Sequence, residues 1–219
     1  MIAVDCGRIG YEQGLALQQE LVARRGAGEV DDVLVVCEHE RVYTVGRGAG
    51  TGNVRHEGDI RVVRTDRGGD VTYHGPGQVV VYPIIRLTDP RQVRTYVGAL
   101  ERACIAVAAD YGLAASTVDG RPGVWVGNDK LAAIGVRIRR DATSHGLAFN
   151  VAPDLDDYTG IVACGLADAG VCSLASLGVA ASPSEVASRL VDALSRTLAR
   201  PLTGWTTPAG LGLPTRRAA

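Results

Sequence analysis

Five cysteines are the first candidates for covalent chemistry, because the chain lacks the GxSxG pentapeptide that presents a nucleophilic serine in α/β-hydrolases. Cys164 stands in the run IVACGL, where a glycine breaks a strand-like apolar segment and a side chain can be presented at a strand end. The alternative is an inert core thiol, the usual state of a cysteine among apolar residues. Core packing explains Cys6, Cys37 and Cys104, and we expect Cys172 in a polar turn.

A catalytic thiol needs a cation or a base beside it, because a thiol with a pKa near 8.5 is only a few per cent ionised at neutral pH. Lys130 is the only lysine in a chain that otherwise uses arginine for positive charge. This indicates a role that a guanidinium cannot fill, such as losing and regaining a proton. The alternative is an exposed turn position after Asn128 and Asp129.

Two other groups of reactive residues are weaker candidates. His145 and Asn150 would complete a papain-like set with a cysteine, but the spacing and flanking signature are missing. Cys37, Glu38 and His39 do not suit a metal ion, because strand alternation places only Cys37 and His39 on one face. We therefore expect no metal site.

The segment RGGDVTYHGPGQ, residues 67–78, has the densest mixture of glycine and polar side chains in the chain. Glycines let a backbone approach a ligand closely, and Arg67, Thr72, Tyr73 and His74 offer hydrogen-bond donors of different reach. The alternative is a tight hairpin with a buried histidine. The segment contains neither GxxxxGK[ST] nor GxGxxG, so it does not support nucleotide-phosphate binding.

Composition narrows the class of protein. The chain has 219 residues, 46% of them hydrophobic and 21% charged, with a net charge of −1. These values are typical of a globular protein and argue against nucleic acid as a partner. An odd number of cysteines without a CxxC pair favours a reduced intracellular protein. The N-terminus has no signal-peptide pattern and no apolar run is long enough to span a membrane, so we expect a cytoplasmic location.

The elements that must position these residues follow from hydrophobic periodicity. Helical spacing predicts helices at residues 11–25, 89–112 and 183–198, the second starting with Asp89 as N-cap and the third with Ser182 and Glu185 as a capping box. β-Branched runs predict strands at residues 33–37, 41–45, 60–65, 79–86, 123–126, 130–139 and 146–151, the last three as an antiparallel meander. We expect one α+β domain over residues 1–200, with mixed and antiparallel sheets flanked by helices, and an irregular tail over 201–219.

Four blocks together resemble the octanoyltransferase family, also called lipoate-protein ligase B. They are RGGDVTYHGPGQ (67–78), DKLAAIGVRIRR (129–140), SHGLAFNV (144–151) and IVACGLADAGVCSL (161–174). The resemblance implies a catalytic fold like that of biotin and lipoate ligases, related to class II synthetases. It also implies transfer of an octanoyl group from octanoyl-acyl carrier protein to a lysine ε-amine of a lipoyl domain, without a cofactor. The acceptors would be the lipoyl domains of 2-oxoacid dehydrogenase E2 subunits and the glycine cleavage H protein.

The same resemblance implies roles for individual residues. Cys164 would be the acyl-thioester nucleophile, and Lys130 would lower the pKa of its thiol. The substrate contacts would be Arg67, Gly68, Gly69, Asp70, Val71, Thr72, Tyr73, His74, Ala133, Ile134, Gly135, Gly146, Leu147 and Ala148. Gly75, Gly77 or Gly165 would offer backbone N–H groups to the oxyanion of a tetrahedral intermediate.

The chain departs from the family pattern at three positions. Glu40 and Ala163 stand where the family has proline, and Cys172 stands where it has threonine. Ala163 directly precedes Cys164, and without the rigid proline ring the backbone would hold the nucleophile less firmly in place. Two other functions remain open: an ATP-dependent lipoate or biotin ligase that forms an acyl adenylate, and a non-catalytic module that binds acyl groups or lipoyl domains.

Overall fold

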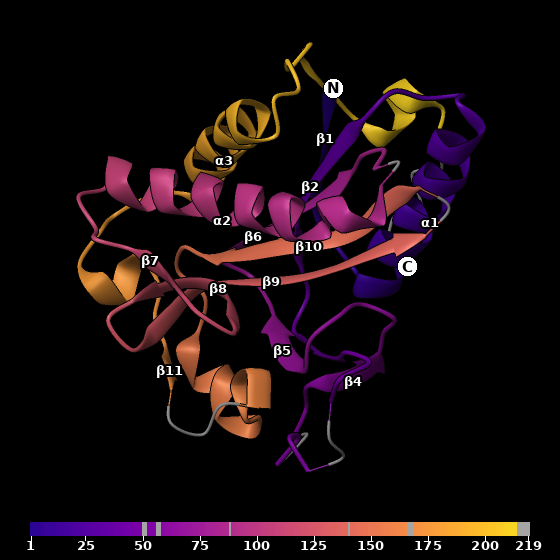
Figure 1. The fold of residues 1–219 in the computed structure, drawn as a ribbon. Helices are drawn as coiled ribbons and strands as arrows, with labels where there is room; N and C mark the ends of the chain where they lie inside the picture. Colours follow the sequence, from indigo (N-terminus) through magenta and orange to yellow (C-terminus); the bar gives the residue numbers. More distant parts are fainter. Residues whose placement is uncertain (50–51, 56–57, 88, 140, 166–168, 214–219) are drawn as a thin grey trace.

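The computed structural model describes residues 1–49, 52–55, 58–87, 89–139, 141–165 and 169–213. Most of its strands belong to one large mixed sheet (Figure 1): β1 Ile2–Ile9, β2 Val33–His39, β6 Gln78–Ile84, β7 Ser116–Val118, β8 Arg121–Val126, β9 Asp129–Arg139, β10 Ala142–Asn150, β11 Gly170–Val171 and β12 Trp205–Thr206. Their order is β12-β1-β2-β6-β10-β9-β8-β7, and β11 pairs with β9. Strands β8, β9 and β10 form the expected antiparallel meander.

A second, smaller sheet contains β3 Val42–Val45, β4 Arg61–Arg64 and β5 Val71–His74 in the order β4-β3-β5. Strand β3 is parallel to β4 and antiparallel to β5. Tyr43, Val71 and Tyr73 of this sheet pack with Ile161 in a separate apolar cluster.

Three α-helices cover the large sheet: α1 Tyr11–Ala27, α2 Val93–Asp110 and α3 Pro183–Thr197. Helices α2 and α3 pack against each other on one face, where Leu100 and Leu190 meet Val81 of the sheet. Helix α1 packs on the other face, where Leu21 meets Val80. Short 3-10 helices complete the chain: η1 Pro90–Gln92, η2 Leu155–Gly160, η3 Ala163–Gly165, η4 Ala175–Leu177 and η5 Pro208–Leu211.

This arrangement confirms the expected α+β architecture of mixed sheets flanked by helices. The N-cap half of the capping box expected at α3 is confirmed, because the Ser182 side chain accepts a hydrogen bond from the Glu185 backbone N–H and Pro183 occupies the first turn. The Glu185 carboxylate instead accepts from the Tyr111 hydroxyl and from Arg189. Within the part of the chain that the structure describes, no helix is long and apolar enough to cross a bilayer.

Strand β1 was not predicted from the sequence. Its residues do not alternate between apolar and polar, because it begins with the apolar run Ile2–Val4, and its register with β2 shifts between Asp5 and Arg8, where Gly7 has φ +58°. A bulge of this kind hides a strand from a period-two pattern. Strand β5 was missed for a similar reason, because it lies inside the glycine-rich segment 67–78.

Three local expectations were wrong. Asp89 caps η1 and not α2, which begins at Val93. Cys172 is 3% exposed and packs in the main core, so it does not lie in a polar turn. The backbone of Cys164 lies in η3 and not at the end of a strand.

The segment after residue 200, expected to be irregular, contains β12 and η5. β12 pairs in parallel with β1, and Leu213 is buried against the α1 side of the sheet. Residues 214–219 lie outside the described residues. Such pairing depends on a strand at the opposite end of the chain, which local composition does not reveal.

Candidate active site

A cavity of about 150 Å³ lies between strands β9 and β10 of the large sheet, strand β5, and the loops that precede β5 and β8. An apolar cavity of this volume accommodates a molecule of about the size of benzene. The cavity is lined by Tyr11, Arg67, Gly69, Asp70, Val71, Thr72, His74, Tyr82, Gly120, Arg121, Pro122, Lys130, Ala133, Ile134, Gly135, His145, Gly146, Leu147 and Ala148. The structure therefore brings segments 67–74, 133–135 and 146–148 together around one space, with Lys130 in its wall.

Strand register brings two of these segments together. β9 and β10 are antiparallel, with Ala133 opposite Ala148 and Gly135 opposite Gly146. A Cβ at Gly146 would lie 2.2 Å from the Val81 carbonyl oxygen, so only glycine lets β10 approach β6 this closely. The small residues on both strands leave the space that the cavity occupies.

The loop before β5 docks directly on β9. The Gly68 N–H donates to the Val136 carbonyl oxygen at 3.0 Å, and a Cβ at Gly135 would lie 3.0 Å from the Gly68 oxygen. Arg67 is buried and donates from Nη2 to the backbone and side-chain oxygens of Thr44, at 2.6 and 3.0 Å. These bonds hold a cationic side chain in the cavity wall. Gly68 itself does not line the cavity.

Successive side chains of β5 point to opposite faces of the small sheet. His74 and Thr72 line the cavity, whereas Tyr73 points the other way and donates its hydroxyl to Asp157 Oδ2 at 2.6 Å. Tyr73 is thus placed outside the cavity, contrary to its predicted role as a substrate contact.

His74 is a neutral, fixed imidazole. Its Nδ1 lies 2.7 Å from Gln78 Oε1, and the Gln78 amide nitrogen donates to Asn150 and to Tyr73 O. The Gln78 oxygen is therefore the acceptor, so His74 Nδ1 carries the proton. Burial, assisted by the nearby His39 ring, lowers the pKa of His74 to about 3.

Lys130 is buried at the start of β9, so its alternative assignment to an exposed turn is wrong. Only 7% of the residue is exposed. Its Nζ donates to the Pro122 carbonyl oxygen at 3.1 Å and lies 4.5 Å from the centre of the Trp125 ring. A Cβ at Gly123 would come within 3.3 Å of Lys130 Cε, so the glycine makes room for the lysine stem. The aromatic face stabilises the cation in this position.

The segment that carries Cys164 connects Asp70 of the cavity wall with Lys130. The Val162 N–H donates to the Asn53 oxygen at 2.8 Å, and a Cβ at Gly165 would lie 2.8 Å from Asp70 Oδ2. After residues 166–168, β11 runs parallel to the start of β9, with Val171 opposite Lys130. The Cys164 side chain lies outside the described part of the structure, and its backbone lies between these two anchors.

Three cavity residues carry aromatic or imidazole groups that the sequence did not single out as contacts: Tyr11, Tyr82 and His145. His145 has φ +56°, a conformation that is rare for a residue with a side chain. Its Nε2 lies 2.7 Å from Asp66 Oδ1. Asp66 also pairs with Arg137, and burial together with Arg67 and Arg137 lowers the pKa of His145 to about 4. The signal in the sequence was the SHG triplet of the third block.

His145 also carries a buried atom without a partner. Among the described residues, Nδ1 has no hydrogen bond, and neither does Nε2 of Gln18, whose Oε1 accepts from the His145 backbone at 2.7 Å. The Gly120–Pro122 turn, also absent from the predicted contacts, closes the cavity beside Lys130.

The remaining thiols are not suited to nucleophilic chemistry. Burial raises the pKa of Cys6 and of Cys172 to about 12 and also raises those of Cys37 and Cys104. This agrees with the expectation that Cys6, Cys37 and Cys104 are packing residues. Over the described ranges, no group of three or more His, Cys, Asp or Glu side chains is arranged to hold a metal ion.

Several solved structures with the same fold carry the names of ligases. A bipartite lipoate protein ligase from Thermoplasma acidophilum superposes with a TM-score of 0.73 at 16% identity, covering 96% of this chain and 88% of the other. A lipoate-protein ligase A bound with ATP gives 0.73 at 17% identity and covers 94% and 88%. The biotin protein ligase of Aquifex aeolicus gives 0.53 at 10% identity and covers 91% and 70%. The expected biotin and lipoate ligase-like fold is confirmed.

Closer relatives share much more of the sequence. An octanoyltransferase of Solibacter usitatus is 46% identical over 197 residues, which are 87% of this chain and 89% of that protein. An octanoyltransferase of Mycobacterium bovis is 47% identical over 199 residues, 88% of this chain and 84% of its own length. The model of the lipoyl protein ligase A/B catalytic domain matches residues 10–195. The chain belongs to the lipoyl protein ligase A/B catalytic domain family and, within it, to the octanoyltransferases.

Proposed function

We propose that this protein transfers an octanoyl group from octanoyl-acyl carrier protein to the lysine ε-amine of apo lipoyl domains through a thioester on Cys164. The observation that carries the proposal is the position of Lys130. The only lysine of the chain is buried in the wall of the cavity, and the strand that follows the Cys164 segment pairs with it. Membership of the octanoyltransferases supports the same reaction.

In the first half-reaction, the Lys130 ammonium stabilises Cys164 as a thiolate, which attacks the carbonyl carbon of the donor thioester. The bond from that carbon to the phosphopantetheine sulfur breaks, and the departing thiolate takes a proton from Lys130. Octanoyl-Cys164 and a neutral Lys130 result. Gly77 and Gly165 already donate their N–H groups to Glu38 and to the Val162 oxygen, and none of Gly75, Gly77 and Gly165 lines the cavity.

In the second half-reaction, neutral Lys130 accepts a proton from the incoming ammonium of the acceptor lysine. That amine, with a pKa near 10.4, is otherwise almost fully protonated at pH 7. The amine attacks the thioester carbonyl, the bond to sulfur breaks, and the second amine proton leaves to solvent. The amide forms and the Cys164 thiolate is regenerated. A thioester already supplies the free energy for amide formation, so the reaction needs no ATP.

The acceptors in this proposal are the lipoyl domains of 2-oxoacid dehydrogenase E2 subunits and the glycine cleavage H protein, and the compartment is the cytoplasm. The cavity wall contributes substrate contacts from Arg67 to His74, Ala133 to Gly135 and Gly146 to Ala148. Gly68 and Tyr73 act through the placement of their neighbours.

The test is incubation with octanoyl-acyl carrier protein, with and without apo lipoyl domain, followed by intact-protein mass spectrometry. We expect a covalent octanoyl adduct on the wild-type protein that disappears when apo lipoyl domain is added. Cys164→Ala should abolish the adduct. Cys172→Ala is the matched control, because it removes a buried thiol beside Lys130 without removing the proposed nucleophile.

An adduct that survives Cys164→Ala would refute the assignment of the nucleophile. Acceptor octanoylation that requires free octanoate and ATP would instead support a ligase that activates the acid as an adenylate. Binding of lipoyl domain without any transfer would support a non-catalytic module.

A further inference from the structure

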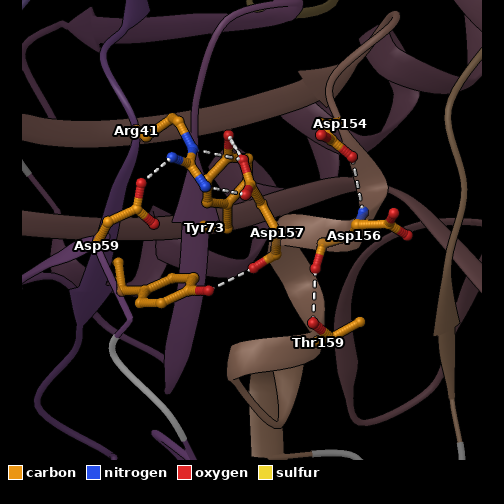
Figure 2. A network of polar contacts seen from close by, with 8 residues as sticks. Arg41, Asp59, Tyr73, Asp154, Asp156, Asp157 and Thr159 are labelled. Carbon is orange, nitrogen blue, oxygen red and sulfur yellow. Dashed lines mark hydrogen bonds and ion pairs between the residues drawn. The ribbon is translucent and has the colours of Figure 1, made fainter.

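A buried carboxylate outside the cavity ties the small sheet to the segment that leads to Cys164 (Figure 2). Asp157 lies in η2 and is 8% exposed. Arg41 donates to both of its oxygens, from Nη2 to Oδ1 at 2.5 Å and from Nε to Oδ2 at 3.0 Å. The Tyr73 hydroxyl donates to Oδ2 at 2.6 Å, and the Tyr43 hydroxyl donates to the Asp157 backbone oxygen at 2.5 Å. We call Arg41, Tyr43, Asp59, Tyr73 and Asp157 the Asp157 cluster.

The partners of Asp157 come from strands β3 and β5 and from the residue directly before β3. Arg41 directly precedes β3, Tyr43 lies in β3 and Tyr73 in β5. Asp59, shortly before β4, accepts a second hydrogen bond from Arg41 at 2.7 Å. The Arg41 guanidinium holds the pKa of Asp157 below its usual range, so the carboxylate is ionised at neutral pH. A bidentate arginine pair of this kind fixes geometry as well as charge.

The same sheet supplies the cavity wall. Tyr73 lies between Thr72 and His74, which line the cavity from the opposite face of β5. A shift of Tyr73 therefore moves both cavity residues. Asp157 and the cavity are connected through a single short strand.

In the other direction, the chain runs from Asp157 to Cys164 in a few residues. η2 ends at Gly160, Ile161 bridges to Val54, and the chain enters η3 at Ala163. Ala163 directly precedes Cys164, and an alanine does not restrict the backbone as a proline ring would. A rigid anchor upstream compensates for that freedom.

We propose that Asp157 is a positioning residue, which aligns Cys164 with Lys130 by clamping η2 to the small sheet through Arg41 and Tyr73. This inference rests on the proposed function, because it assigns the clamp a role in presenting the Cys164 nucleophile. Asp157 touches neither the cavity nor the reacting atoms.

A second buried carboxylate, Asp32, is a control that distinguishes an effect on the position of Cys164 from an effect on the stability of the whole protein. Asp32 is 7% exposed and pairs with Arg25 at 2.7 Å, and it also accepts from the Arg86 backbone N–H at 3.1 Å. Arg200, beyond the end of α3, also pairs with Asp32 at 3.1 Å. The partners of the Asp32 side chain thus lie on α1, beyond the end of β6 and beyond the end of α3, and none belongs to the small sheet or to η2. Asp32→Asn and Asp157→Asn remove the same charge from equally buried carboxylates, so both should lower the midpoint of thermal unfolding.

The experiment measures the rate at which iodoacetamide alkylates Cys164, by peptide mapping of the full-length protein at pH 7 and pH 10. Alkylation follows the thiolate, so at pH 7 it reports on activation by Lys130 and at pH 10 on access alone. Relative to wild type, we expect Asp157→Asn to slow alkylation at pH 7 by about 10-fold, and to leave the rate at pH 10 within about two-fold. A misplacement of about 1 Å can cost up to about 100-fold in the chemical step, so octanoylation from the carrier protein should slow by about 10- to 100-fold.

Asp32→Asn should leave alkylation and octanoylation within about two-fold of wild type. The inference would be overturned if both variants changed the alkylation and octanoylation rates equally, or if Asp157→Asn slowed alkylation equally at both pH values. Asp157 would then be a stabilising residue only. If Asp157→Asn does not fold, Tyr73→Phe removes one hydrogen bond to the same carboxylate. For this variant we expect a smaller decrease in the alkylation rate of Cys164, at pH 7 and not at pH 10. The two proposals fail separately: wild-type protein without a Cys164-dependent octanoyl adduct refutes the proposed function, whereas alkylation tests the clamp without any substrate.

Discussion

Replacing Ala133 by valine tests whether the cavity between β9 and β10 holds the acyl chain. Ala133 lines the cavity opposite Ala148 and lies three residues along β9 from Lys130, about 10 Å at the rise of a strand. A medium-length acyl chain whose carbonyl end lies near Lys130 would place its far end at about this distance. The substitution adds two carbons to the wall, and valine suits a strand, so the fold should tolerate it.

The expected effect follows from the carbons displaced. Burial of each methylene contributes about 0.8 kcal/mol, so two displaced carbons cost about 1.6 kcal/mol. At about 1.36 kcal/mol per tenfold change in rate, this is a loss of about 15-fold in kcat/KM for octanoyl-acyl carrier protein. Hexanoyl-acyl carrier protein lacks those two carbons, so its kcat/KM should change by less than about three-fold.

The assay compares initial rates with octanoyl and hexanoyl donors and one apo lipoyl domain. Ala152→Val is the control, because Ala152 is exposed and lies just after β10, outside the cavity. Equal losses with both donors would indicate a damaged fold in place of a shortened cavity. Unchanged rates with both donors would show that the acyl chain lies elsewhere and would refute the placement.

Other predictions concern the buried charges and the close-packed backbone. Lys130→Arg keeps a positive charge, but a guanidinium cannot readily accept a proton, so acylation of the enzyme should slow less than transfer to the acceptor. Rapid-quench measurements of the two half-reactions test this, and equal losses of rate in both would refute the division of roles. Burial lowers the pKa of His74 to about 3 and of His145 to about 4, so the unfolded chain binds more protons between about pH 6.5 and 4. The free energy of unfolding should therefore fall as the pH falls through that window, by roughly 2 kcal/mol per histidine at pH 5, and equal urea midpoints at pH 7.5 and pH 5 would contradict this. Gly146→Ala places a Cβ 2.2 Å from the Val81 oxygen, so the free energy of unfolding should fall by about 1–3 kcal/mol. Gly52→Ala is the control, because a Cβ there meets open space and should not lower the free energy of unfolding. Thermal melting of both variants measures the difference.

Local patterns predicted the elements whose signals lie within one stretch of chain. Ser182, Pro183 and Glu185 mark the start of α3, and the polar turns between β8, β9 and β10 mark the meander. Strand β1 could not be predicted because its residues show no period-two alternation and its register with β2 shifts around Gly7. Strand β12 could not be predicted because its partner lies about 200 residues away along the chain. Backbone pairing over such distances depends on the whole sheet and not on local composition.

For the candidate site too, some features could be predicted from the sequence and others depend on the fold. Three of the four sequence blocks, those at 67–78, 129–140 and 144–151, contain most of the cavity wall, because glycine and small residues recur where backbones approach a ligand closely. They did not indicate which faces of β5 the side chains occupy. Tyr73 was predicted as a contact, yet alternation turns it toward Asp157 while Thr72 and His74 face the cavity.

The sequence by itself determined the family, the α+β class and the unusual status of Lys130 as the only lysine, because composition and motif spacing are properties of the chain alone. Only the tertiary structure decided that Lys130 is buried over Trp125, that His145 lies in the cavity wall, and that Asp157 joins the small sheet to the Cys164 segment. The pairing of β8 with β9 sets Trp125 opposite Lys130. The other two relations join residues far apart in sequence, which only the packing of the two sheets and the segments between them brings together.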